Sequence, residues 1–155
     1  PYDKNGNLAR QGEVNSELLK NLNDLPYYQL NAPKSLGYEW VEKNIFTLLS
    51  DSKCAIEDQL ATTVEHAISQ IARHLPQGQT LITGGGAYNS FLIERLEKSV
   101  QPAHQLIIPA PNIIEFKEAL IFAFLGVLKL RNEVNCLKSV TGASEDNIGG
   151  VVYAK

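Results

Sequence analysis

The sequence contains no methionine and only two cysteines, Cys54 and Cys136, among its 155 residues. So few cysteines exclude a disulfide-stapled secreted scaffold, and the absence of a CxxC or Cys/His cluster argues against a metal site. Two reduced thiols are instead typical of a cytosolic protein. Basic residues are also scarce: 14 Lys and Arg stand against 17 Asp and Glu, for a net charge of −3. This balance argues against a general nucleic-acid binder, which carries a basic stripe.

Long hydrophobic runs are missing as well. The longest covers residues 119–128, which is far short of the ~20 residues that a helix needs to cross a bilayer. The chain opens at Pro1 in a turn-like stretch, without the basic start and apolar segment of a signal peptide. We therefore expect no membrane association. We also expect the chain to be part of a longer protein whose N-terminal portion is absent from it.

The residues that are present suit one ordinary globular domain. Apolar residues make up 44% of the chain and charged residues 20%, which is too apolar and too weakly charged for a disordered segment. A chain of this length can bury a sizeable core.

The first half of the chain reads as a hairpin followed by helices. The turn signal Asn5-Gly6-Asn7 predicts a hairpin whose return strand covers residues 8–14. Asn15 is a suitable N-cap for a short helix over residues 16–22. A proline-punctuated loop precedes a predicted helix over residues 38–49.

The second half alternates helices with short strands. The clearest apolar periodicity, over residues 55–75, predicts an amphipathic helix. We then expect strands at 80–83, 105–108 and 149–154, separated by helices at 90–98 and 114–130, with Asn89 as a suitable N-cap for the first of these helices. This alternation indicates an α/β fold. We predict that the three strands share one sheet and that helices 55–75 and 114–130 pack against it.

The sharpest local motif is a glycine loop, Leu81-Ile82-Thr83-Gly84-Gly85-Gly86-Ala87-Tyr88-Asn89, between a strand and a helix. Glycines let a ligand approach the backbone closely, and a helix N-terminus suits ribose or phosphate oxygens. A tight turn without a ligand is the competing interpretation. No Lys-Ser or Lys-Thr follows the glycines, which excludes a P-loop. Asn89 stands where a Rossmann loop needs its third glycine, which disfavours a dinucleotide-binding domain.

Two further groups of polar residues carry weaker signals. Glu115 and Glu118 are spaced to lie near one another on a helix, and Glu118 borders an apolar run. Either could face a ligand in a cleft or be a solvated acid of the first helical turn. The small residues Ser139–Ser144 could line a pocket or form a turn. The three histidines lack metal-ligand spacing and are expected to be surface or partly packed residues.

Taken together, these motifs resemble the C-terminal part of anhydro-N-acetylmuramic acid kinase, in the sugar kinase/actin-like ATPase superfamily. The resemblance covers nearly the whole chain, in the family's order and at about its spacing. The matching pieces are Pro33-Lys34-Ser35-Leu36-Gly37, the glycine loop 81–89, Glu118-Ala119-Leu120-Ile121-Phe122-Ala123-Phe124-Leu125, Ser139-Val140-Thr141-Gly142-Ala143 and Gly149-Gly150-Val151-Val152-Tyr153.

The resemblance implies an actin-like ATPase (ribonuclease H-like) lobe of α/β class, with a mixed sheet and packed helices. Residues 1–155 would form a single C-terminal nucleotide-binding lobe of a two-lobe kinase, with the N-terminal lobe absent. The implied reaction uses ATP and Mg²⁺ to phosphorylate 1,6-anhydro-N-acetylmuramic acid while water opens the anhydro ring. The product is N-acetylmuramic acid 6-phosphate, in cytoplasmic recycling of the cell wall.

The resemblance also assigns residues to roles. Gly84, Gly85, Gly86, Ala87 and Asn89 would bind the adenosine side of the nucleotide. Glu118 matches a family glutamate that would face the sugar or the attacking water. The family's phosphate loop and catalytic aspartate belong to its N-terminal part and are not found here, so the chain by itself is expected to be inactive.

Several points stay open at this stage. The roles of Glu115, Lys34, Ser139 and Thr141 are not assigned, and Glu115 stands where the family more often has Asp. The expected partner is the small sugar substrate, with no nucleic acid or membrane, and a homodimer is an open alternative. The competing function class is a non-catalytic actin-like module that binds a nucleotide or a partner protein. A phosphate loop and a catalytic Asp encoded upstream of Pro1 would decide for the enzyme.

Overall fold

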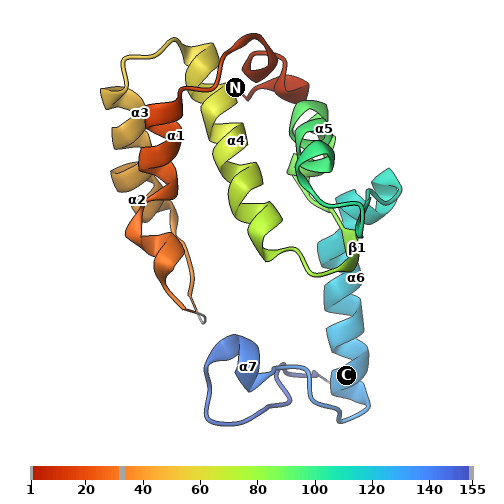
Figure 1. Cartoon of the computed structure of the whole chain (residues 1–155). Coiled ribbons are helices and arrows are strands. Elements are labelled where there is room, and N and C mark those ends of the chain that lie inside the picture. The colour runs from red at the N-terminus through yellow and green to blue at the C-terminus, as the bar shows by residue number, and fades with distance from the viewer. Residues whose placement is uncertain (1, 32–33, 154–155) are drawn as a thin grey trace. The chain divides into compact units, whose positions relative to one another are not determined.

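A computed structural model describes residues 2–31 and 34–153. Pro33 of the first motif and Ala154 of the predicted last strand therefore lie outside the described residues. The chain divides into two compact units: the first extends to Pro109, and the second begins at Ala110 (Figure 1). The class is mixed α/β, as predicted, with helices and a small parallel sheet.

The first segment is not the predicted hairpin. It forms two short 3₁₀ turns, Lys4–Gly6 and Ala9–Gln11. The Asp3 carboxylate accepts the backbone N–H groups of Leu8 and Ala9, at 2.9 and 3.0 Å. Because this side chain satisfies amides that a strand would offer to its neighbour, the Asn-Gly turn leads into a coil of turns and the predicted return strand does not form.

The helices that follow confirm the predicted positions. Helix α1 spans Ser16–Asn23, and the Asn15 side chain caps it by accepting the Leu18 amide N–H at 2.9 Å. Residues 38–51 are one helical stretch made of α2 (Tyr38–Val41), a π-helical segment (Glu42–Phe46) and α3 (Thr47–Asp51). The two stretches form one core cluster, whose buried members are Leu18, Leu22 and Ile45.

The long helix α4, Ile56–His74, organises the first unit. It packs against α1, against α5 (Ser90–Ser99) and against the turn Ala9–Gln11 (Figure 1). Thr62, fully buried, accepts the Asn15 amide N–H at 2.9 Å and donates to the Asp58 carbonyl at 2.6 Å. The chain before α1 is thereby tied to the first turns of α4.

The sheet of the described residues holds two parallel strands, β1 (Gly78–Leu81) and β2 (His104–Ile107), with α5 (Ser90–Ser99) between them in sequence. Thr80 pairs with Leu106. The Ile82 amide donates to the Ile107 carbonyl at 2.8 Å, which prolongs the pairing by one residue. A parallel pair joined by a helix is the β-α-β crossover that the alternation of strands and helices predicts.

The predicted third strand is absent from its described part, residues 149–153, so the expected mixed sheet is a two-stranded parallel one in the described residues. Gly149 bonds instead to a side chain, because its amide donates to the Asn135 Oδ1 atom at 2.7 Å. The Asn135 side chain also donates to the Gly149 carbonyl at 3.3 Å. A strand forms only beside a hydrogen-bonded neighbour, and here the pairing is limited to a single antiparallel bridge between Cys136 and Asn147.

The second unit is built around α6, Pro111–Leu130. This helix begins three residues before the predicted start, since Pro111 occupies the first turn, where its missing N–H costs nothing. Phe116 departs from helical geometry, with φ −105° and ψ 15°. The short α7, Lys138–Thr141, ends at Gly142 in the left-handed region, with φ 73°. The predicted packing of helix 114–130 on the sheet stays a prediction.

Candidate functional site

The glycine loop connects β1 to α5 as the sequence predicts. Gly84, three residues after the end of β1, has φ 84° and ψ 177°, a conformation in which a side chain is strained. Residues Gly85–Tyr88 then form a 3₁₀ turn, closed by a 3.0 Å hydrogen bond from the Ala87 amide to the Gly84 carbonyl. Ala87, within this turn, is buried. The loop is thus a defined backbone structure with its glycines outward.

The space around the glycines is open. Chain neighbours aside, no atom lies within 4 Å of the position that a Cβ would occupy at Gly84 or Gly85. At Gly86, Leu92 Cδ2 lies 3.9 Å from that position, which is ordinary contact. Gly85 has no positive φ, so its backbone tolerates a side chain. The glycine at this position is therefore not required by the fold, and the exposed backbone is accessible to a ligand.

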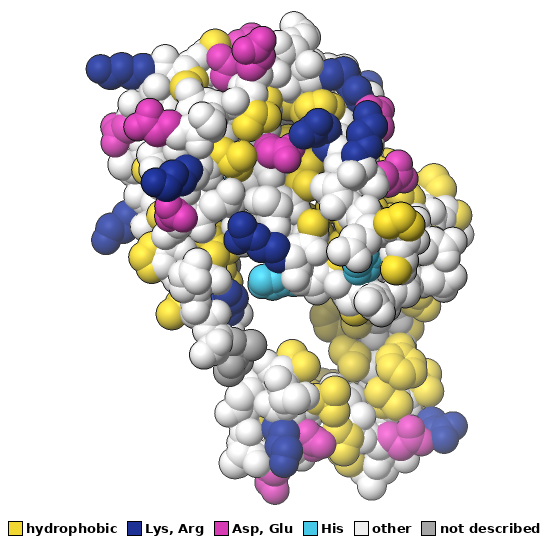
Figure 2. Space-filling model, viewed as in Figure 1, with side chains coloured by type: hydrophobic (Ala, Val, Ile, Leu, Met, Phe, Trp, Pro, Cys, Tyr) yellow, Lys and Arg dark blue, Asp and Glu magenta, His cyan; other side chains and the backbone are white. Residues whose placement is uncertain are grey.

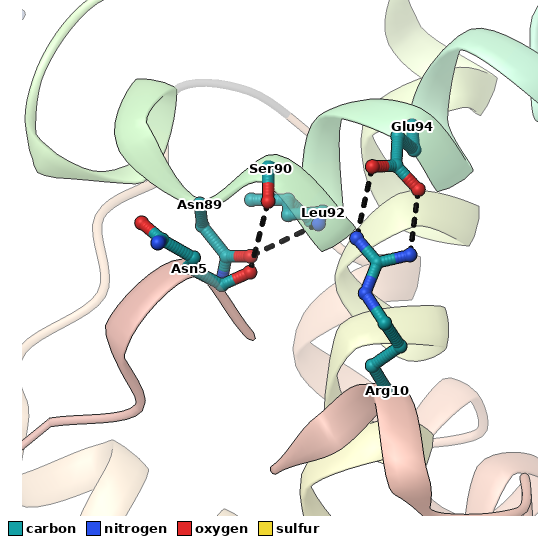
Figure 3. A network of polar contacts seen from close by, with 6 residues as sticks. All are labelled: Asn5, Arg10, Asn89, Ser90, Leu92 and Glu94. Carbon is teal, nitrogen blue, oxygen red and sulfur yellow. Dashed lines mark hydrogen bonds and ion pairs between the residues drawn. The ribbon is translucent and has the colours of Figure 1, made fainter. Parts of the chain in front are cut away.

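Asn89 ends the loop and begins α5. Its Oδ1 atom accepts the Leu92 amide N–H at 3.0 Å (Figure 3). Its carbonyl accepts the Ile93 amide at 3.1 Å. This confirms the predicted N-cap. One of the amides of the helix N-terminus is therefore satisfied by Asn89 itself, which fixes the angle at which the loop enters the helix.

The N-terminal segment contacts α5, and no pattern in the sequence predicted this contact. The Arg10 guanidinium makes a two-point ion pair with Glu94, at 2.7 and 2.9 Å, and Ser90 Oγ donates to the Asn5 carbonyl at 3.2 Å (Figure 3). Hydrogen bonding to Arg10 holds the pKa of the Glu94 carboxyl below its usual value. These partners lie 84 and 85 residues apart, so no local sequence pattern could have indicated them.

Gly6 lets the N-terminal segment approach this closely. It is buried with φ 71°, and a Cβ there would lie 2.5 Å from Asn89 Oδ1 and 2.6 Å from Phe91 Cβ. The two Asn-Gly residues predicted as a hairpin turn thus pack against the cap of α5.

Glu118 and Glu115 both lie on α6, in the second unit, and both are exposed. The non-helical Phe116 stands between them. Their carboxylates are available to a ligand, whereas the glycine loop belongs to the first unit.

The remaining candidates have structural roles in the described residues. Ser139 and Thr141 belong to the helical turn α7, where Thr141 Oγ1 donates to the Leu137 carbonyl at 3.0 Å. Lys34 Nζ donates to the Tyr27 carbonyl at 3.1 Å and lies over the Tyr27 ring, 4.8 Å from its centre.

His66 is buried, 5% exposed, where the sequence analysis expected a surface or partly packed residue. Its Nδ1 atom lies 2.8 Å from Asn23 Oδ1, and its Nε2 atom lies 2.9 Å from the Tyr28 hydroxyl. Asn23 Oδ1 also accepts bonds from Ser69 and Gln70, so it is an acceptor, and Nδ1 carries the proton. Burial lowers the pKa of His66, and the charge of Arg73 lowers it further.

Within residues 2–31 and 34–153, no three His, Cys, Asp or Glu side chains are grouped so that they could hold a metal ion. In the same part of the chain, no helix combines the length and the apolar character needed to cross a membrane.

Comparison with known proteins identifies relatives along the entire chain. The family described as anhydro-N-acetylmuramic acid kinase matches residues 1–155. An anhydro-N-acetylmuramic acid kinase of Vibrio cholerae is 35% identical over 165 residues, covering 99% of this chain and 44% of the relative. One from a Sulfurovum species is 38% identical over 160 residues, covering 98% of this chain and 43% of the relative. The chain thus spans less than half the length of these relatives. Because the match extends over every residue of the sequence, the chain belongs to the anhydro-N-acetylmuramic acid kinase family.

Proposed function

We propose that this chain forms part of an ATP-dependent sugar kinase that phosphorylates 1,6-anhydro-N-acetylmuramic acid and opens its anhydro ring with water. The support is the family match over residues 1–155 and the kinase names of the relatives. The observation that carries the proposal within the chain is the glycine loop, whose outward backbone is open at Gly84 and Gly85.

The proposed reaction balances as one phosphoryl transfer coupled to one hydrolysis. Water adds to the anomeric carbon, and the bond between that carbon and the 6-oxygen breaks. The freed 6-oxygen takes the γ-phosphoryl group of ATP, and ADP leaves. A general base must accept a proton from the water, and we assign this base to the part of the kinase that this chain does not contain.

The chain's own contribution is binding and positioning. The loop of Gly84, Gly85, Gly86 and Ala87, capped by Asn89, would hold the nucleotide on its adenosine side. Glu118 would accept a hydrogen bond from the sugar or orient the water, since a carboxylate is a strong acceptor.

Magnesium, when bound, would neutralise charge on the phosphates. The described residues offer no cluster of ligands for it, so we assign it no protein ligand here. We place the chain in the C-terminal, nucleotide-binding part of the kinase and expect it to act in cytoplasmic recycling of cell-wall sugars.

The direct test of the nucleotide site is Gly85→Val in the complete protein, meaning the full polypeptide encoded by the reading frame that contains this chain. The backbone at Gly85 accepts a side chain and its surroundings are empty, so folding should be unaffected. A branched side chain would occupy the space that the nucleotide needs, so ATP affinity should fall by about tenfold or more, on the scale of 1.4 kcal/mol.

ATP affinity is measured by calorimetry beside a melting curve, with Gly85→Ala as the smaller substitution. The expected order of affinity is wild type, Ala, then Val, at constant melting temperature. Unchanged ATP binding in a folded Gly85→Val protein would remove this loop from the nucleotide site.

A further inference from the structure

The second unit exposes an unusual amount of apolar surface along α6. Residues 119–128 carry no charge. Phe122 and Phe124 are 71% and 60% exposed, although at 3.6 residues per turn their directions differ by about 160°. A helix that is apolar all round normally lies inside a core. Here it is exposed on nearly opposite sides.

The exposed residues form a patch rather than isolated positions. Figure 2, viewed as Figure 1, shows hydrophobic side chains gathered over the lower part of α6. Soluble proteins rarely leave such contiguous apolar patches uncovered. The large exposed residues of the helix include Phe116, Leu120, Phe122, Phe124, Val127 and Leu130.

A groove beside the helix continues this surface. It has a volume of about 800 Å³ and lies between the C-terminal half of α6 and residues 149–153, with Cys136 also in its lining. Val151, Val152 and Tyr153 are exposed and belong to no strand. The groove and the unpaired segment are what remains when a helix and a strand lack the neighbours that complete a core.

We propose that this apolar surface of α6, the groove and residues 149–153 pack against the part of the same polypeptide that corresponds to the unmatched length of the relatives. That part is more than half of each relative, because the match covers 44% and 43% of them. The second unit is then the segment by which this chain joins the rest of the kinase. The proposal concerns packing alone, and it stands or falls separately from the catalytic roles proposed above.

A second copy of the chain suits this surface less well. A twofold contact covers the same single patch on both partners. Phe122 and Phe124 lie on nearly opposite sides of α6, so both are covered only when further chain surrounds the helix. The occupant is therefore apolar and made of several elements, as the remainder of a domain would be.

Cys136 provides a probe that needs no substitution. It is exposed and borders the groove, whereas Cys54 lies in the first unit and is half-buried. A maleimide is added to the native complete protein, and to the same protein in denaturant, and modification of each cysteine is followed by mass spectrometry. We expect Cys136 to react at least tenfold more slowly in the native protein than in denaturant.

Two results for the complete protein would overturn the proposal. One is a Cys136 that reacts equally fast in the native and the denatured protein. The other is a reading frame that encodes nothing beyond this chain. If Cys136 is protected in the 155-residue chain by itself, the occupant lies within this chain and the proposal is likewise wrong. The occupant is then a second copy if the chain sediments as a dimer, and the first unit if it sediments as a monomer.

A pair of variants tests the same surface through stability. Leu130 and Leu30 are 74% and 57% exposed, and they lie in the second and first units. In the complete protein, Leu130→Ser should lower the melting temperature by several degrees, and Leu30→Ser should change it less. If the Leu130→Ser protein has the same melting temperature as the wild type, this surface is not buried in the complete protein and the proposal is wrong.

Discussion

At the scale of single residues, Glu118 is the residue of this chain that we propose contacts the sugar or the attacking water. We predict that Glu118→Gln in the complete protein lowers kcat or kcat/KM for the anhydro sugar by about 10²-fold, the scale of a positioned acid–base group. An amide keeps the shape of the side chain and loses its charge, so ATP affinity should change little.

Glu115→Gln is the matched control, since Glu115 is also exposed on α6 and has no assigned role. Steady-state kinetics of both variants, with melting temperatures, separate catalysis from stability. Near-normal turnover of Glu118→Gln would leave it as an ordinary solvated acid near the start of a helix.

The buried His66 predicts a pH dependence of stability. Its pKa in the folded protein is lowered, chiefly by burial, from an ordinary value near 6.5. In the window between the folded and the unfolded pKa, the unfolded chain binds the proton more readily than the folded one. The contribution of neutral His66 is therefore fully present above pH ~6.5, and it is lost as the pH falls below that value.

Denaturant unfolding of the complete protein at pH 7.5 and 5.5 measures this loss. His66→Gln removes the titration, so its free energy of unfolding should change less between the two pH values than that of the wild type. Equal changes in both proteins would show that the His66, Asn23 and Tyr28 contacts do not couple to a proton.

At the scale of elements, α1 and α5 begin in the same way, each with an Asn side chain as its N-cap. Asn15 caps α1 through Leu18, and Asn89 caps α5 through Leu92, with bonds of 2.9 and 3.0 Å. Replacing either by Ala should cost about 1 kcal/mol of unfolding free energy. Only Asn89 adjoins the glycine loop, so Asn89→Ala alone should also weaken ATP binding.

The variants Asn15→Ala and Asn89→Ala separate an effect on helix stability from an effect on ATP binding. Unfolding free energy and ATP affinity are measured for both variants of the complete protein. Equal ATP affinities, at equal losses of stability, would mean that the start of α5 does not position the nucleotide loop.

At the scale of the whole molecule, we propose that the chain provides binding surfaces and that part of the catalytic centre lies outside it. We predict that the 155-residue chain, incubated with ATP, Mg²⁺ and the anhydro sugar, forms no sugar phosphate, because positioning supplies most of the rate in phosphoryl transfer. Product is sought by mass spectrometry, with the complete protein as the positive control. Formation of product at a rate near that of the complete protein would contradict the division of roles proposed here.

The sequence alone determined the features that depend on neighbours along the chain. Apolar periodicity predicted α4, and the Asn side chains at 15 and 89 predicted both caps, since a cap is a bond to a residue three positions on. The strand, glycine turn and helix around Gly84 were predicted for the same reason.

Tertiary structure decided what depends on distant partners. The N-terminal segment became turns docked on α5, because Arg10 meets Glu94 across 84 residues. His66 became a buried group through contacts with Asn23 and Tyr28, 43 and 38 residues away. Residues 149–153 read as a strand but formed none, because a strand needs the backbone of a second segment beside it, and a residue's own sequence neighbours do not provide one.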